Sequence, residues 1–250
     1  MLRLRFVTVM VAVVAGVCIA GCGGGGDGPV AEVNGVGIPK PMLAHWMSVV
    51  LGGDYAQNVG SRAPDGLVAE PADYDKCTRA GAEIKGKGAP LPESTLLARC
   101  KQLHEAVKLQ ALSYLIAVQW RVNEAKEYGE GVTDQEVRRQ LERVKTEQFP
   151  KPGAFQAYLR ERHWSEADEM YLLKRNLLDE KFFQRITREG NKSGGGRAVV
   201  TRLVEEANQK QTGKTTCKPG YIVWQCKQYK GSSDTQPPAV LVEQIARVAG

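Results

Sequence analysis

The sequence predicts a mainly α-helical protein, and two observations support this fold class. The segment from about Ser94 to Tyr128 contains no glycine and no proline, and its apolar residues surround much of a helix circumference, which indicates one long central helix. Two later segments begin with a serine or threonine that is followed three residues on by an acidic residue, the pattern of a capped helix start. A short β-hairpin or extended segment is expected before the helices.

The first elements are predicted from two short apolar runs on either side of Asn34 and Gly35. This dipeptide favours a tight turn, so residues 30–38 are expected to form a hairpin, or a strand and a turn. Pro39 suits the start of a helix in which apolar residues recur three and four positions apart. Glycine, proline and polar residues dominate residues 52–92, which we expect to form a long surface loop.

The helices after the long central helix are predicted from their boundaries. Thr133 and Glu136 match a capping box, and the helix that they open should end before Pro150. Ser165 and Asp168 form a second box of the same type, after a shorter intervening helix. The apolar residues of the shorter helix and of the helix after the second box are Phe155, Leu159, Met170, Leu173, Leu177, Phe182 and Ile186.

The C-terminal part begins after a glycine run at residues 194–196. An amphipathic stretch follows this run, and Pro219 and Gly220 suit a turn between two cysteines. Residues 191–230 are therefore expected to form a helix and a disulfide hairpin. Residues 231–250 have the composition of a linker and a short tail helix.

The N-terminal residues match an export signal. Two arginines precede an apolar run at residues 6–20 that is too short to span a membrane, and small residues then lead to Cys22. Residues 1–21 are therefore expected to be a signal peptide. The pattern resembles the bacterial lipobox, which implies a lipid anchor on Cys22, residues 22–29 as a flexible tether, and an extracytoplasmic lipoprotein anchored to the cell membrane. The alternative is an ordinary secretory signal that is cleaved nearby.

Four further cysteines follow the expected anchor. An even number in an exported protein indicates disulfides, and three pairings are possible. Pairing of Cys77 with Cys100 and of Cys217 with Cys226 is favoured, because it closes two modest loops and keeps each bridge within one element. No spacing is Cys-x-x-Cys, so neither redox catalysis nor structural zinc is indicated.

The charge pattern bears on the class of partner. The chain has 34 basic and 28 acidic residues, and removal of the signal leaves 32 basic ones, a net charge of about +4. These charges are interspersed, without the basic tract or the aromatic platform that nucleic-acid binding requires. We therefore expect no nucleic-acid partner.

Three segments follow one another in an order shared with a known family. They are VAEVNGVGIPKPML from residue 30, NEAKEYGEGVTDQEVRRQLERVK from residue 123 and FPKPGAFQAYLRERHWSEADEMYLLKRNLLDEKFF from residue 149. They resemble the N-terminal chaperone domain of the SurA and PrsA foldases and of trigger-factor-like export chaperones. The resemblance implies a SurA/trigger-factor-like helical domain over residues 30–190, with residues 52–92 as an inserted loop and a C-terminal helix that packs back onto the domain.

Members of that family often continue into a parvulin prolyl-isomerase module, which we do not find in this sequence. The interval between Ile186 and Cys217 is too short for such a module. Gly52, Gly53 and Asp54 are similar to a parvulin motif, but they follow the first predicted helix and lack flanking strands. The resemblance is therefore to the chaperone domain without the isomerase.

The resemblance implies a holdase-type chaperone, which binds unfolded or newly exported proteins without chemistry. Methionine and flat aromatic side chains tolerate varied partners, so they are the candidate contacts with a client peptide. These candidates are Met42, Trp46, Met47, Trp120, Phe149, Phe155, Trp164 and Tyr171. The alternative role of each of them is to fill the hydrophobic core.

Two alternative functions remain open. An adaptor lipoprotein would use the same helices to bind one specific partner, and a peptidyl-prolyl cis-trans isomerase would act as the full-length family members do. The sequence has no hydrolase, zinc or phosphate-loop motif, and its three histidines fall on three different predicted helices. We therefore expect no catalytic residue, no metal and no cofactor.

Overall fold

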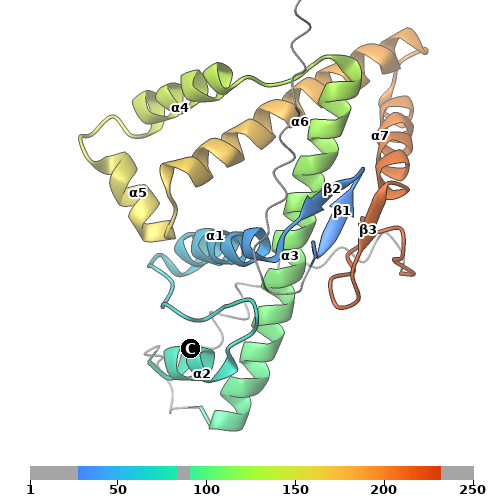
Figure 1. The fold of residues 1–250 in the computed structure, drawn as a ribbon. Helices are drawn as coiled ribbons and strands as arrows, with labels where there is room; N and C mark the ends of the chain where they lie inside the picture. The colour runs from blue at the N-terminus through green and yellow to red at the C-terminus, as the bar shows by residue number, and fades with distance from the viewer. Residues whose placement is uncertain (1–27, 84–90, 232–250) are drawn as a thin grey trace, which may run out of the picture.

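The computed structural model describes residues 28–83 and 91–231, and in these ranges the protein is mainly helical, as predicted (Figure 1). The elements are β1 (Ala31–Val33), β2 (Val36–Ile38), α1 (Lys40–Val59), α2 (Tyr74–Glu83), α3 (Glu93–Tyr128), α4 (Asp134–Gln148), α5 (Ala154–Arg162), α6 (Glu166–Lys192), α7 (Arg197–Thr212) and β3 (Thr215–Cys217). Figure 1 shows α3 as a spine, with α1, α2, α4 and α5 on one side and the sheet and α7 on the other. Helix α6 crosses from the first side to the second.

The predicted hairpin is present, and it belongs to a three-stranded antiparallel sheet. Asn34 and Gly35 both have positive φ, as the tight turn between β1 and β2 requires. On its other edge β1 pairs with β3, which places Ala31 opposite Cys217. The C-terminal segment therefore closes onto the first strand of the fold.

The expectation of a long surface loop over residues 52–92 was wrong for much of that range. Helix α1 continues through Gly52 and Gly53 to Val59, and α2 lies in the middle of the segment. The Asp73 side chain accepts a hydrogen bond of 2.9 Å from the Lys76 amide and so caps the start of α2. Contacts from other elements hold both helices, so local composition alone gave the wrong assignment.

The long helix α3 is confirmed, and its apolar circumference is explained by its neighbours. It contacts α1, α2, α6 and β1, and its middle residues Leu112 and Ile116 are fully buried. Gly129 ends it in the left-handed conformation, with its amide bonded to the Ala125 carbonyl. The other elements pack on these neighbours: α4 and α7 on α6, α5 on α1, and β2 and β3 on β1.

Both predicted capping boxes are confirmed. Thr133 Oγ1 accepts from the Glu136 amide at 3.2 Å, and Glu136 accepts in return from the Thr133 amide at 2.7 Å. Ser165 and Asp168 make the corresponding pair of bonds at the start of α6. Helices α4, α5 and α6 enclose a second small core, whose buried residues are Val137, Leu141, Val144, Phe155, Leu159 and Leu173. We call these three helices the arm.

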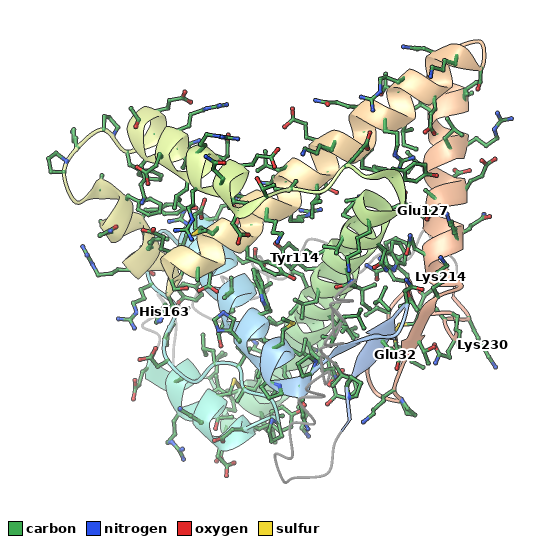
Figure 2. The ribbon with its side chains drawn as sticks, turned by 45° about the horizontal axis from the view of Figure 1, so that its top comes forward. Glu32, Tyr114, Glu127, His163, Lys214 and Lys230 are labelled. Atoms are coloured by element: carbon green, nitrogen blue, oxygen red, sulfur yellow. A yellow bond between two sulfur atoms is a disulfide. The ribbon has the colours of Figure 1, made fainter. Side chains whose placement is uncertain are left out.

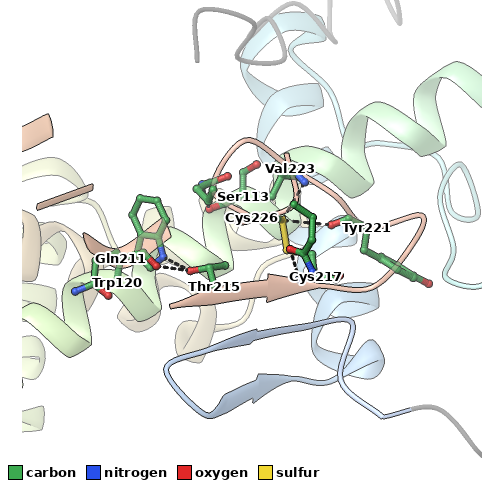
Figure 3. Close-up of a disulfide and its surroundings, with 10 residues drawn as sticks. Ser113, Trp120, Gln211, Thr215, Cys217, Tyr221, Val223 and Cys226 are labelled. Atoms are coloured by element: carbon green, nitrogen blue, oxygen red, sulfur yellow. Dashed lines mark hydrogen bonds between the residues drawn. A yellow bond between two sulfur atoms is a disulfide. The ribbon is translucent and has the colours of Figure 1, made fainter. Parts of the chain in front are cut away.

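Both disulfides follow the favoured pairing, Cys77 with Cys100 and Cys217 with Cys226. The first ties α2 to α3, so the pairing was predicted correctly but the expectation that this bridge would stay within one element was wrong. Figure 3 shows the second, beside the hydrogen bond of 2.8 Å that Trp120 Nε1 donates to Thr215 Oγ1. These contacts fix the C-terminal segment to the spine as well as to the sheet.

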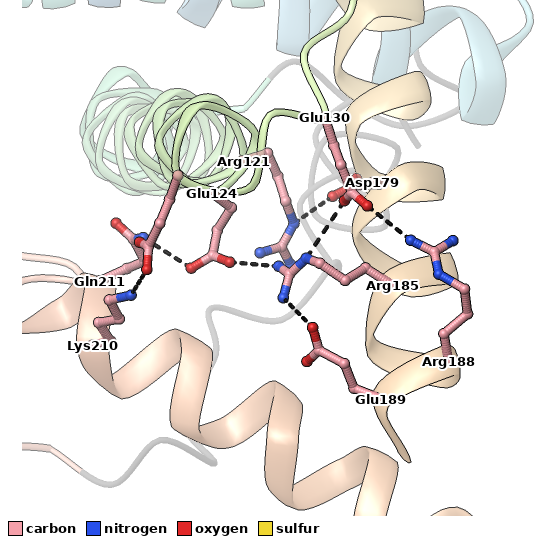
Figure 4. A network of polar contacts seen from close by, with 10 residues as sticks. Arg121, Glu124, Glu130, Asp179, Arg185, Arg188, Glu189, Lys210 and Gln211 are labelled. Carbon is pink, nitrogen blue, oxygen red and sulfur yellow. Dashed lines mark hydrogen bonds and ion pairs between the residues drawn. The ribbon is translucent and has the colours of Figure 1, made fainter. Parts of the chain in front are cut away.

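A buried ion pair joins α3, α6 and α7 (Figure 4). Arg185 Nη2 donates to Glu124 at 2.7 Å, and both side chains are more than nine-tenths buried. Gln211 donates to the other Glu124 oxygen at 3.0 Å, while Glu130 and Glu189 each lie 3.5 Å from the Arg185 guanidinium. The buried Arg185 guanidinium is thus surrounded by three carboxylate groups where the helices meet.

The signal peptide, the anchor Cys22 and the tail helix expected in residues 231–250 lie outside the described residues, as does most of the tether at 22–29. Among the helices that are described, none is both long enough and apolar enough to cross a membrane.

We expect Glu124→Gln to lower the free energy of unfolding by about 3 kcal/mol, because it removes the closest counter-charge of the buried Arg185. The matched control is Glu127→Gln on the same helix, which breaks a half-exposed pair with Lys210 and should cost less than about 1 kcal/mol. Urea unfolding followed by circular dichroism measures both. Equal losses in the two variants would contradict the assigned role of the buried pair.

Candidate functional site

The corner between α5 and α6 rests directly on α1, and two glycines make this approach possible. A Cβ atom on Gly52 would lie 1.9 Å from the Arg162 carbonyl oxygen, and one on Gly53 would lie 2.6 Å from the Trp164 ring. Trp164 Nε1 donates a hydrogen bond of 2.7 Å to the Val49 carbonyl oxygen. The two glycines of α1 therefore leave the space in which the arm packs against this helix.

Beside this contact lies a cavity of about 300 Å³, bounded by α1, α3, α5 and α6. It is lined by Trp46, Val49, Val50, Gly53, Asp54, Gln57, Gln110, Tyr114, Tyr158, Arg162, Trp164 and Leu172. A volume of this size is at the lower end of the range for ligand-binding cavities and suits one or two side chains. Two smaller cavities also lie among the described residues, and neither has a comparable aromatic lining.

Stacked aromatic rings form much of the cavity wall. Trp46 stacks on Tyr114 with 4.8 Å between ring centroids, and Tyr158 meets Trp164 edge to face at 5.9 Å. Figure 2 shows Tyr114 near the centre of the molecule, between α3 and the arm. Packed rings offer flat apolar surface at a small cost in conformational entropy.

Polar groups complete the lining. Gln110 Nε2 donates to Asp54 Oδ2 at 3.3 Å, and burial raises the pKa of the Asp54 carboxyl group. The Arg162 guanidinium lies 4.0 Å from the Tyr158 ring centroid and 3.6 Å from Glu161. The cavity therefore offers hydrogen-bond donors and acceptors next to aromatic faces.

The tyrosines of the wall remain protonated at neutral pH. Burial, with the nearby Glu169 carboxylate, raises the pKa of Tyr158 to about 12, and burial also raises that of Tyr114. The Tyr158 hydroxyl donates to Glu169 at 3.4 Å, and burial raises the pKa of this carboxyl group too. Tyr158 is thus a neutral donor within the wall, whereas the buried Tyr114 hydroxyl has no hydrogen-bond partner among the described residues.

The eight predicted contact residues lie in different parts of the structure: some line the cavity, and others are exposed elsewhere or buried in the two cores. Trp46 and Trp164 line the cavity, and the Tyr171 ring lies 4.7 Å from that of Trp46, tilted by 45°. Met42 is 39% exposed on α1 but does not line the cavity. The buried or partly buried remainder belongs to the two cores: Met47, Trp120, Phe149 and Phe155. Met47, Trp120 and Phe155 are buried core residues in this conformation, and Trp46, at 4% exposure, also belongs to the main core.

The sequence analysis missed the polar lining, which is formed by Asp54, Gln57, Gln110 and Arg162. Asp54 and Gln57 fall in the range that we expected to be a loop, and no motif links these two residues to Gln110 or Arg162. Recognising that α1 continues through its two glycines would have placed Asp54 and Gln57 on the side of α1 that meets the arm.

The three histidines lie apart, and each contacts a segment of the chain distant in sequence. His45 Nε2 lies 2.6 Å from Asp168 Oδ1, His104 Nε2 lies 3.2 Å from Glu70, and His163 Nε2 lies 3.0 Å from the Ala63 carbonyl oxygen. In the part of the chain that the structure covers, no cluster of histidine, cysteine and acidic residues has the arrangement of a metal site.

No family model, no curated protein and no solved structure matches this chain.

We expect Gly52→Ala to destabilise the protein by about 1 to 2 kcal/mol, because its Cβ would meet the Arg162 backbone. The sign is informative, since alanine otherwise stabilises a helix by up to about 1 kcal/mol relative to glycine. Gly131→Ala is the matched control, with no atom near its Cβ, and should change stability by less than about 0.5 kcal/mol. Thermal unfolding measures both, and a stabilised Gly52→Ala variant would contradict the close approach.

The docking of the arm should weaken in acid. Burial raises the pKa of Asp168, but hydrogen bonds from Ser165 and His45 outweigh this effect and hold the pKa below its ordinary value. A lowered pKa means that the stabilisation is complete above the ordinary value of about 4 and is lost as the pH falls through the folded value. Hydrogen exchange at the start of α6 between about pH 5 and pH 2 measures this loss. Asp168→Asn should remove the dependence, and an unchanged pH profile in that variant would contradict the assignment.

Proposed function

We propose that this protein is a membrane-anchored extracytoplasmic chaperone of the holdase type, which binds segments of unfolded exported proteins without chemical change. The observation that carries the proposal is the aromatic cavity beneath the arm, with amide, hydroxyl and charged groups in its lining. It would receive one or two side chains of an extended client segment. Such a segment exposes both apolar side chains and unpaired backbone groups, and the cavity can bind both.

The size of the cavity supports weak and general binding. A site of about 300 Å³ buries little of a long client, so affinity comes from a few contacts and release stays fast. Two disulfides agree with an oxidising compartment outside the cytoplasm. The lipobox-like signal and the resemblance to the SurA and PrsA chaperone domain support the same proposal.

The test is suppression of aggregation of reduced, unfolded lysozyme, followed by light scattering, with the mature chain in lipid nanodiscs. Val50→Trp should reduce suppression several-fold, because the added indole would occupy the cavity that Val50 lines. Met42→Trp is the matched control, since it adds the same ring at an exposed position of the same helix, away from the cavity. Equal behaviour of the two variants would contradict binding in the cavity.

A proline-limited refolding assay beside it distinguishes the alternatives. Suppression of aggregation without faster refolding supports a holdase. Acceleration of refolding would instead support prolyl-isomerase activity, and absence of both effects would favour an adaptor for one specific partner.

A further inference from the structure

The Asp54 carboxylate is the one feature of the cavity that general apolar binding leaves unexplained. It is half-buried on α1, and the Gln110 amide is its side-chain partner. None of the ion pairs formed within the described residues includes it, and the causes of its raised pKa include no basic neighbour. An acid in this position is costly unless a cation accompanies it.

The other charged group in the lining is already engaged. The Arg162 guanidinium lies over the Tyr158 ring, is 3.6 Å from Glu161 and acts on the nearby Glu169 carboxyl group. With these two acids beside it, Arg162 does not give the cavity a net positive character. Asp54 is therefore available to a cation from outside.

The aromatic wall also suits a cation. Arg162 over Tyr158 and Arg175 over Tyr114, the latter at 5.5 Å, show that rings of this wall already accept guanidinium groups within the chain. Indole faces bind cations better still, and the half-buried Trp164 ring lines the same space. A lysine or arginine side chain also carries a methylene stem that packs on apolar walls.

We propose that the cavity selects client segments with a lysine or arginine among apolar residues, its stem against Trp164 and its charged head at Asp54. This inference rests on the proposed function and specifies its substrate class.

The test uses fluorescein-labelled decapeptides that differ only at one central position, which is lysine, norleucine or glutamate, with the mature chain in nanodiscs. We expect the lysine peptide to bind about tenfold more tightly than its norleucine counterpart, and the glutamate peptide to bind weakest. In the Asp54→Asn variant the lysine and norleucine peptides should bind with about equal affinity, and the affinity for the norleucine peptide should not change. Glu32→Gln, which removes the same charge from the exposed position of β1, is the matched control and should keep the full preference.

Thermal unfolding checks that the Asp54→Asn variant folds, and its midpoint should equal or exceed that of the unaltered chain, because a desolvated charge is removed. Equal binding of the lysine and norleucine peptides, or a preference that survives Asp54→Asn, would overturn the selectivity and leave the chaperone proposal standing. Failure of all peptides to bind would overturn both.

Discussion

The approach of the α5–α6 corner to α1 at Gly52 is the contact on which the candidate site depends. With any larger residue at this position the Arg162 carbonyl group would have to move away, and Trp164 would lose its bond to the Val49 carbonyl oxygen. The cavity exists because the arm is held close to α1 here while α3 and α6 keep the other walls in place. The absence of a side chain at Gly52 thus determines the shape of the cavity.

Two kinds of interaction hold the arm and the spine together, and they respond differently to conditions. The contacts at the corner combine close packing with the His45–Asp168 pair, which is partly exposed to solvent. At the far end of α6, Arg185 is buried with Glu124 and is shielded from salt and solvent. The half of the arm next to the cavity is therefore the more responsive half, a property that the proposed binding of varied segments would require.

What could be predicted from the sequence was local. The capping box at Thr133, the turn at Asn34 and Gly35, and the disulfide of Cys217 with Cys226 depend on residues within ten positions of one another. Helix α3 was predictable because its length and its lack of glycine and proline leave no competing structure.

What could not be predicted depended on distant partners. Strand β3 has three residues and no alternating pattern, and it exists because β1 offers an edge. The continuation of α1 through Gly52 and Gly53 is decided by atoms of the arm about 110 positions away, which outweigh the low helix propensity of glycine. Asp54 and Gln110 meet across a separation of 56 positions that no motif marks.

The position of β3 also has a consequence for the timing of folding. Strand β1 is made first and β2 covers one of its edges at once, but its other edge pairs with residues 215–217. That edge stays unsatisfied until most of the polypeptide has been synthesised and delivered. An open strand edge readily pairs with strands of other chains. The time between synthesis of β1 and synthesis of residues 215–217 is therefore the period in which this protein is most prone to aggregate.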